Sequence, residues 1–206
     1  MEWILHLYHL PYNPTEPVIC FDERPCQLIR EVLQPLPMKS GRVLREHYSY
    51  KREGTCCALV ALEPLRGFRM VEVFEKRSKI EYALFMKAIA EQYPEAKTIH
   101  LIQDNLSTHT KGAFYKAFPA KEAFELAQKF QFHFNPVKAS WLNMVEIELS
   151  AIARLCLNRR IPEIDILTDE VKQLVKERNR DQVKINWQFT VDKARDKFES
   201  RYFNSV

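Results

Sequence analysis

Glycine is scarce in this sequence, and its scarcity excludes several nucleotide-binding folds. Only four glycines occur among the 206 residues. None of them belongs to a G-x-G-x-x-G or G-x-x-x-x-G-K loop, the motifs with which Rossmann domains, kinases and P-loop proteins hold phosphates. The sequence therefore argues against these three classes together.

Paired cysteine motifs and long apolar runs are also missing. The five cysteines are odd in number and contain no C-x-x-C pair. This pattern argues against a disulfide framework and a zinc knuckle, and it favours a reduced, cytoplasmic protein. No apolar run approaches the roughly 20 residues of a membrane helix, and the first ten residues do not look like a signal peptide. We expect no membrane partner.

What the sequence does contain is the composition of one globular domain. Hydrophobic residues make up 46% of the chain and charged residues 28%, and the length is sufficient to bury a sizeable core. The 31 basic and 27 acidic side chains leave a net charge of +4. This mild basic excess permits a nucleic-acid partner without requiring one.

Strand and helix signals alternate in a definite order. Three strand-like runs come first, and helices and strands then alternate, which indicates an α/β fold with helices covering a mixed sheet. Strands are predicted at 17–21, 55–62, 68–74, 98–103 and 132–134, and helices at 78–93, 121–130 and 141–158.

Three segments lie outside this alternating pattern. Residues 1–16 are interpreted as a lead-in or linker that precedes the α/β domain at 17–160. Residues 23–52 carry three prolines and are predicted to be an irregular excursion. Residues 161–206 are predicted to form a C-terminal extension of two charged helices, packed on the domain through Trp187 and Phe189 between them.

Two acidic residues follow predicted strands directly. Asp22 comes after the first strand and Asp104 after the fourth. Carboxylates at the carboxyl ends of neighbouring parallel strands meet at one edge of a sheet and would attract Mg²⁺ or Mn²⁺. A third carboxylate would come from the helix at 141–158, where Glu146 and Glu148 lie on opposite shoulders of the apolar stripe. Periodicity alone leaves the choice between them open.

Each acidic residue also has an ordinary structural explanation. Asp22 would end a strand before a turn, and Asp104 with Asn105 would form an Asx-type turn. Glu146 follows Asn143 by three residues, which is a helix-capping pattern. For each residue taken singly, the structural explanation is better than the catalytic one. If all of them hold, however, the occurrence of an aspartate directly after two separate strands is a coincidence.

Three sequence blocks resemble the signature motifs of a transposase family. The family is the bacterial insertion-sequence branch of the mariner superfamily, whose members carry a DDE endonuclease domain. The resemblance extends from about residue 7 to residue 202. Its blocks are Cys20–Pro25 (CFDERP), Asp104–His109 (DNLSTH) and Ala139–Glu146 (ASWLNMVE).

This resemblance implies an RNase H-like fold with a mixed five-stranded sheet, helices on both faces and the C-terminal helical extension. It implies that Asp22, Asp104 and Glu146 are the catalytic residues and the ligands of two Mg²⁺ (or Mn²⁺) ions, and that Glu148 points away. The implied activity is cleavage of DNA at the ends of a mobile element, followed by transfer of those ends into target DNA.

The resemblance also implies partners and leaves alternatives. Double-stranded DNA, a homodimer that synapses two ends, and a bacterial cytoplasmic location at the nucleoid are expected. We expect the family's N-terminal helix-turn-helix domain to be missing here, and a separate DNA-binding chain is therefore a further expected partner. The alternatives are an RNase H-like nuclease without strand transfer and an inactive fragment of a split transposase.

Further candidate residues flank the acidic positions. Asn105, His109 and Asn143 belong to the matching blocks and are expected to contact DNA or to support the metal ligands. Phosphate contacts are expected from Lys51, Arg52 and Lys138, because DNA-backbone binding is mainly charge neutralisation. Val137-Lys138 stands where the family usually has a Lys-His pair, which removes any role specific to histidine there.

Overall fold

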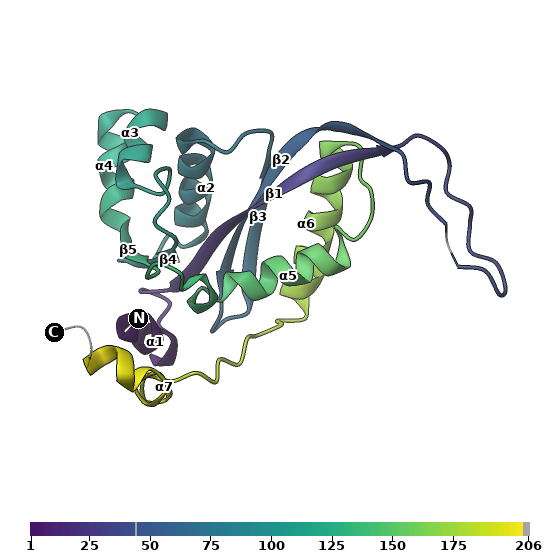
Figure 1. Cartoon of the computed structure of the whole chain (residues 1–206). Helices are drawn as coiled ribbons and strands as arrows, with labels where there is room; N and C mark the ends of the chain where they lie inside the picture. Colours follow the sequence, from purple (N-terminus) through teal and green to yellow (C-terminus); the bar gives the residue numbers. More distant parts are fainter. Residues whose placement is uncertain (44, 204–206) are drawn as a thin grey trace.

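A mixed sheet forms the centre of the molecule (Figure 1). The structure, a computed structural model, describes residues 1–43 and 45–203. The sheet has five strands in the order β3-β2-β1-β4-β5, with β1, β2 and β3 antiparallel and β4 and β5 parallel to β1. This confirms the predicted sheet. The strands are β1 (Val18–Glu31), β2 (Tyr50–Glu63), β3 (Phe68–Phe74), β4 (Ile99–Gln103) and β5 (Phe130–Phe134).

Helices cover both faces of this sheet, as predicted. One hydrophobic core lies between the sheet and α2, α3 and α4, and a second lies between the other face and α1, α5, α6 and α7. The first group comprises α2 (Lys79–Gln92), α3 (Phe114–Ala117, after the 3-10 turn η1 Lys111–Ala113) and α4 (Ala120–Lys129). The second comprises α1 (Glu2–His9), α5 (Val145–Leu155, after the 3-10 turn η2 Ser140–Leu142), α6 (Ile164–Arg180) and α7 (Val191–Phe203). None of the described helices is long and apolar enough to span a membrane.

Local signals placed some boundaries correctly and missed others. Ser78 caps α2 through a complete capping box with Glu81, as its sequence context indicates. The predicted helix at 141–158 is instead divided into η2 and α5, because Asn143 has an extended backbone and donates its side-chain amide to the Phe21 carbonyl at 2.8 Å. A tertiary contact thus overrides the helical periodicity.

The excursion predicted at 23–52 is wrong over much of its length. β1 continues through Pro25 to Glu31, and β2 begins at Tyr50, so the two strands form a long antiparallel ribbon. The pairing of β1 with β4 extends only to Cys20. Beyond Cys20, no strand of the described part of the chain pairs with this edge of β1, and proline is tolerated at such an edge.

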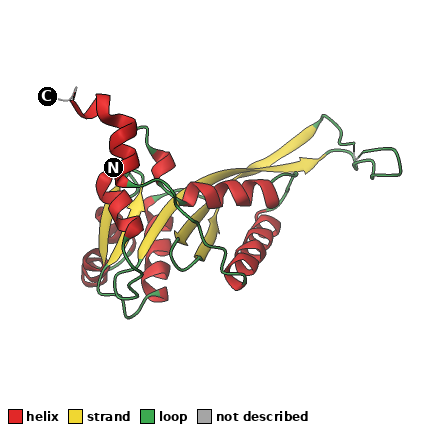
Figure 2. Ribbon diagram, turned by 90° about the horizontal axis from the view of Figure 1, so that it is seen from below, coloured by secondary structure: helices red, strands yellow, loops and turns green. Residues whose placement is uncertain are grey.

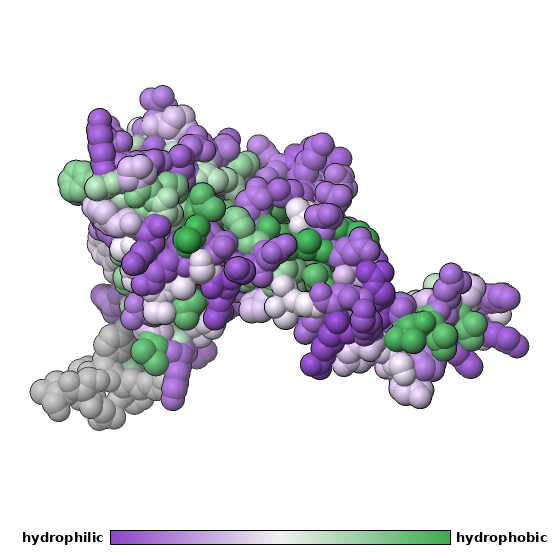
Figure 3. All heavy atoms as spheres, turned by 90° about the horizontal axis from the view of Figure 1, so that it is seen from above, coloured by the Kyte–Doolittle hydropathy of each residue, from purple (hydrophilic) through white to green (hydrophobic). Residues whose placement is uncertain are grey.

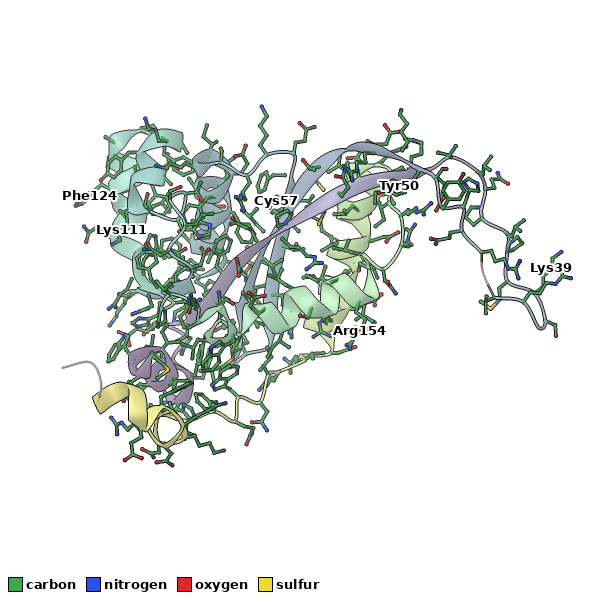
Figure 4. The ribbon with its side chains drawn as sticks, viewed as in Figure 1. Lys39, Tyr50, Cys57, Lys111, Phe124 and Arg154 are labelled. Carbon is green, nitrogen blue, oxygen red and sulfur yellow. The ribbon has the colours of Figure 1, made fainter. Side chains whose placement is uncertain are left out.

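The ribbon projects from the body and ends in a loop, residues 32–43 and 45–49 (Figures 1 and 2). Apolar side chains gather on this projection, as the space-filling view shows (Figure 3). Leu36, Met38 and Val43 are among the exposed apolar residues of the loop. Lys39 lies near its tip and Tyr50 near its base (Figure 4).

The two terminal segments pack on the body beside each other. The segment interpreted as a lead-in contains α1, whose buried residues Ile4, Leu5, Leu7 and Tyr8 belong to the second core. The C-terminal extension contains the two predicted helices, and α7 contacts α1. Trp187 and Phe189 are anchors as predicted, with their rings against Tyr8 and Trp141.

Candidate active site

Asp22 and Asp104 occupy neighbouring positions across the parallel strands. Cys20 of β1 is paired with Ile102 of β4, and continuing this register by two residues brings Asp22 beside Asp104. Asp104 follows the last residue of β4, as predicted. Asp22 does not end its strand, contrary to expectation, but it lies where β1 loses β4 as a neighbour. The two carboxylates therefore meet at the edge where parallel pairing stops.

Glu146 reaches the same region from α5, which packs against β1 and β2. The Asn143 hydrogen bond to Phe21 ties the start of this helix to the residue before Asp22. The charges of Asp104 and Glu146 both raise the pKa of Asp22, which shows that the three carboxylates lie within electrostatic range of one another. The structure thus brings together the three residues that the sequence singled out.

Glu148 points into the opposite side of α5. It is fully buried, and it pairs with Arg69 of β3 at 2.8 Å and with Arg178 of α6 at 2.7 Å. A carboxylate held by two guanidinium groups has its charge neutralised within the protein. Of the two glutamates that periodicity left open, Glu146 is therefore the one whose charge acts on Asp22.

The surroundings of Asp22 disfavour its ionised form. Burial is the main factor that raises its pKa, and the neighbouring carboxylates add to it, so that the pKa reaches about 7. The backbone N–H of Glu23 donates to Asp22 Oδ1 at 2.8 Å and offsets part of this effect. A carboxyl group with a pKa near 7 resists ionisation at neutral pH. A bound cation would favour the ionised form and offset the repulsion from the two neighbouring carboxylates.

The donor set fits a hard divalent cation. Three carboxylates supply only oxygen ligands, which Mg²⁺ and Mn²⁺ prefer. Burial of Asp22 and, to a smaller extent, repulsion from Asp104 and Glu146 raise its pKa, and a bound cation would offset both effects. Among the described residues no three such side chains already surround one point as metal ligands would. The three carboxylates therefore lie near one another, but their oxygens do not yet surround a common point as the ligands of a metal ion would.

His109 lies between two carboxylates. Its Nδ1 is 2.5 Å from Asp104 Oδ1, and its Nε2 donates to Glu23 Oε2 at 2.6 Å. Burial alone would lower the pKa of His109, but the two carboxylates outweigh it and raise the pKa to about 9. The contact with His109 is also the main factor that lowers the pKa of Asp104. His109 is thus a protonated support for Asp104 and is too deeply buried to contact DNA.

The remaining predicted residues divide by their distance from the carboxylates. Asn105 is exposed next to Asp104, and Lys138 is exposed at a positive φ between β5 and η2. Asn143 is buried and donates a hydrogen bond to the backbone carbonyl of Phe21.

Lys51 and Arg52 lie on the projecting ribbon, far from the carboxylates. At about 3.3 Å per residue, they are roughly 25–30 Å along β2 from Val60, the residue paired with Asp22. The structure does not bring these two residues to the carboxylates.

Two residues at this edge are not among those predicted from the sequence. Glu23 belongs to the matching block Cys20–Pro25. It is not predicted as a site residue, because Asp22 in the same block already accounts for the acidic signal of the motif. Asn135 follows β5 and continues the row of Asp22 and Asp104 across the sheet. Among the described residues it has both amide atoms buried without a hydrogen-bond partner. Its position directly after a strand, like that of Asp104, is the signal in the sequence that points to it.

Comparison with known proteins relates this geometry to a family. A family model described as DDE superfamily endonuclease matches residues 17–168. No curated protein sequence matches the chain.

Solved structures share the fold at low sequence identity. The Mos1 transposase paired-end complex with the left transposon end matches with a TM-score of 0.57 and 13% identity, over 88% of this chain and 55% of that chain. The Mos1 mariner paired end complex with Mn matches with a TM-score of 0.51 and 14% identity, over 86% of this chain and 57% of that one. A pre-cleavage Mos1 transpososome matches with a TM-score of 0.52 and 11% identity, over 91% and 61%.

These likenesses establish the RNase H-like fold, and this chain spans little more than half of each Mos1 chain. The family model covers well over half of the present chain and includes all three carboxylates. The chain therefore belongs to the DDE superfamily endonuclease family.

Proposed function

We propose that this chain is the catalytic part of a DNA transposase, which cleaves phosphodiester bonds with divalent metal ions and joins the freed ends to target DNA. The observation that carries the proposal is that Asp22 and Asp104 lie side by side at one edge of the sheet, with Glu146 within electrostatic range of Asp22. Membership of an endonuclease family and a fold shared with Mos1 transposase support it.

The carboxylates would hold the metal ions. Asp22, Asp104 and Glu146 would bind two Mg²⁺ or Mn²⁺ ions, which when bound activate the attacking hydroxyl group and stabilise the leaving oxygen of a phosphoryl transfer. Asp22, whose burial and neighbouring carboxylates raise its pKa to about 7, would bind a metal ion in its ionised form. His109 holds Asp104, and the Asn143 amide holds the β1 backbone beside Asp22.

DNA would approach the edge of the sheet where these carboxylates lie. Asn105 and Lys138 are exposed there, and they are the residues that we propose contact phosphates. The Mos1 complexes are described as paired-end complexes, and on this likeness we propose that two copies of the present chain also assemble on two DNA ends.

Plasmid nicking tests the catalytic role of the carboxylates. Purified protein with Mn²⁺ should nick supercoiled DNA, and Asp104→Asn should lower the rate by about 100-fold or more, because a neutral amide is a poor metal ligand. Asp169→Asn, which changes an exposed aspartate of α6, is the matched control and should keep the wild-type rate. Equal nicking by Asp104→Asn would assign the activity to a contaminant and contradict the proposal.

The products distinguish a transposase from a simple nuclease. A labelled duplex with a free 3′-hydroxyl should become covalently joined to plasmid DNA if the chain performs strand transfer. Nicked DNA without joined product, at all metal concentrations, would instead favour an RNase H-like nuclease.

A further inference from the structure

Glu23 is a buried carboxylate whose contacts lead to both aspartates of the site. Its backbone N–H donates to Asp22 Oδ1 at 2.8 Å. Its side chain, only 7% exposed, accepts from His109 Nε2 at 2.6 Å, and the other ring nitrogen of His109 lies 2.5 Å from Asp104 Oδ1. Arg77 approaches the second oxygen of Glu23 at 3.3 Å. One residue thus reaches Asp22 directly and Asp104 through a histidine.

The surrounding packing holds the His109 ring in one orientation. Tyr82 stacks on the ring with 4.9 Å between centroids, and Phe21 meets it edge-on at 5.1 Å. The Gln103 amide donates to the His109 carbonyl at 3.2 Å, and the Tyr82 hydroxyl donates to Gln103 at 2.8 Å. These contacts fix the plane of the ring. The hydrogen bond to Glu23 fixes which way its nitrogens point.

Asp104 needs such support more than Asp22 does. Asp22 lies within β1 and is fixed by the backbone. Asp104 lies beyond the end of β4, and its side chain is 43% exposed. A carboxylate at a strand end can adopt several rotamers, and fixing one of them costs conformational entropy. His109 selects one rotamer before any ligand arrives.

We propose that Glu23 is a positioning residue, which orients His109 and through it the Asp104 carboxylate for metal binding. This inference rests on the proposed function, because it concerns the same metal ligands. Partners that orient metal ligands in this way typically change metal affinity or activity by about 10- to 100-fold when removed. The inference goes beyond the three carboxylates by assigning a role to a fourth acidic residue, which need not touch the metal.

Metal titration of matched variants tests the inference. Mn²⁺ binding is measured by calorimetry and by electron paramagnetic resonance for the wild-type protein and for Asp104→Asn, Glu23→Ala, Glu23→Gln and Glu122→Ala. Glu23→Ala should bind Mn²⁺ about 10- to 100-fold more weakly. Glu23→Gln should stay within about threefold of the wild type, because its amide oxygen still accepts from His109. Rescue by glutamine is what a positioning role predicts and a ligand role does not.

Glu122→Ala controls for general damage. Glu122 forms an ion pair with Lys87 at 2.7 Å between α4 and α2, away from the carboxylates, and its loss should leave Mn²⁺ affinity unchanged. Wild-type affinity in Glu23→Ala would overturn the inference and leave the proposed function intact. Equal loss in Glu23→Ala and Glu23→Gln would also overturn it, because Glu23 would then act as a ligand or through its charge.

A crystal structure of Glu23→Ala separates this inference from the proposed function. If wild-type protein and Asp104→Asn bind Mn²⁺ equally, the metal site itself is contradicted. The orientation of Asp104 in the Glu23→Ala crystal then decides the inference alone. A His109 ring turned away and a changed Asp104 rotamer would support it, whereas an unchanged Asp104 would overturn it.

Discussion

At the scale of single residues, the ionised form of Asp22 lowers the stability of the folded protein. Its folded-state pKa of about 7 lies above the ordinary value of 3.8, so the folded protein favours the protonated form more than the unfolded chain does. The corresponding stability is fully present below about pH 4 and is lost as the pH rises through about 7. Ionised Asp22 therefore destabilises the metal-free protein at alkaline pH.

Removing that charge should stabilise the metal-free protein. We expect Asp22→Asn to raise the free energy of unfolding by about 1 kcal/mol at pH 8 in the presence of a chelator, because the amide buries no charge and is not repelled by Asp104 and Glu146. The gain should shrink at pH 5.5, where wild-type Asp22 is already protonated. Urea denaturation at the two pH values measures both quantities. Unchanged stability at pH 8 would show that Asp22 is not under this electrostatic strain.

At the scale of secondary-structure elements, one buried ion network joins three of them. Glu148 of α5 pairs with Arg69 of β3 and with Arg178 of α6. Asn179 of α6 adds two hydrogen bonds to the backbone of Arg69, each 2.8 Å long. The network orients α5 so that Glu146 is on the side of Asp22, and it ties the C-terminal extension to the sheet.

Breaking this network should be costly. Arg69→Met is expected to lower the free energy of unfolding by about 3–5 kcal/mol, because it removes the fully buried partner of a fully buried carboxylate. Arg178→Met should cost less, since Arg69 remains and Arg178 is partly exposed. Chemical denaturation of both variants measures the difference. A smaller loss for Arg69→Met than for Arg178→Met would contradict this account of the network.

At the scale of the whole molecule, two cores share one sheet while the ribbon projects beyond both (Figures 1 and 2). β1 is the central strand, paired with β2 along its length and with β4 at its start. The loop that joins β1 and β2 contributes little to either core and exposes Lys39, Arg42 and Arg45. The body of the fold therefore does not depend on continuity of the chain in this loop.

Limited proteolysis tests this independence. Trypsin should cleave first in the loop, because exposed segments with few contacts are preferred sites of nicking. The two fragments should remain associated, since β1 stays hydrogen-bonded at the centre of the sheet. Mass spectrometry identifies the cut, and size-exclusion chromatography of the nicked protein should give one peak. Separation of the fragments without denaturant would show that the loop is needed to hold β1 in place.

The sequence alone determined the features that depend on residues close to one another along the chain. β3 has the bounds that its apolar run predicts, and the cap of α2 at Ser78 follows directly from the capping residues. The order of strands and helices indicates the mixed sheet, and the same order predicts that Asp22 and Asp104 share one of its edges. The catalytic roles of Asp22, Asp104 and Glu146 stay a prediction from the resemblance and the geometry.

Only the tertiary structure decided the features that depend on contacts between distant segments. Glu23 and His109 lie 86 residues apart, so no local pattern predicts their hydrogen bond. Pairing with β2 extends β1 far beyond the apolar run that marks its start, and the bond from Asn143 to Phe21 divides the predicted long helix. Periodicity records which face of an element is apolar. Which polar side chains meet across elements is set by packing, because it depends on how the whole sheet brings its neighbours into register.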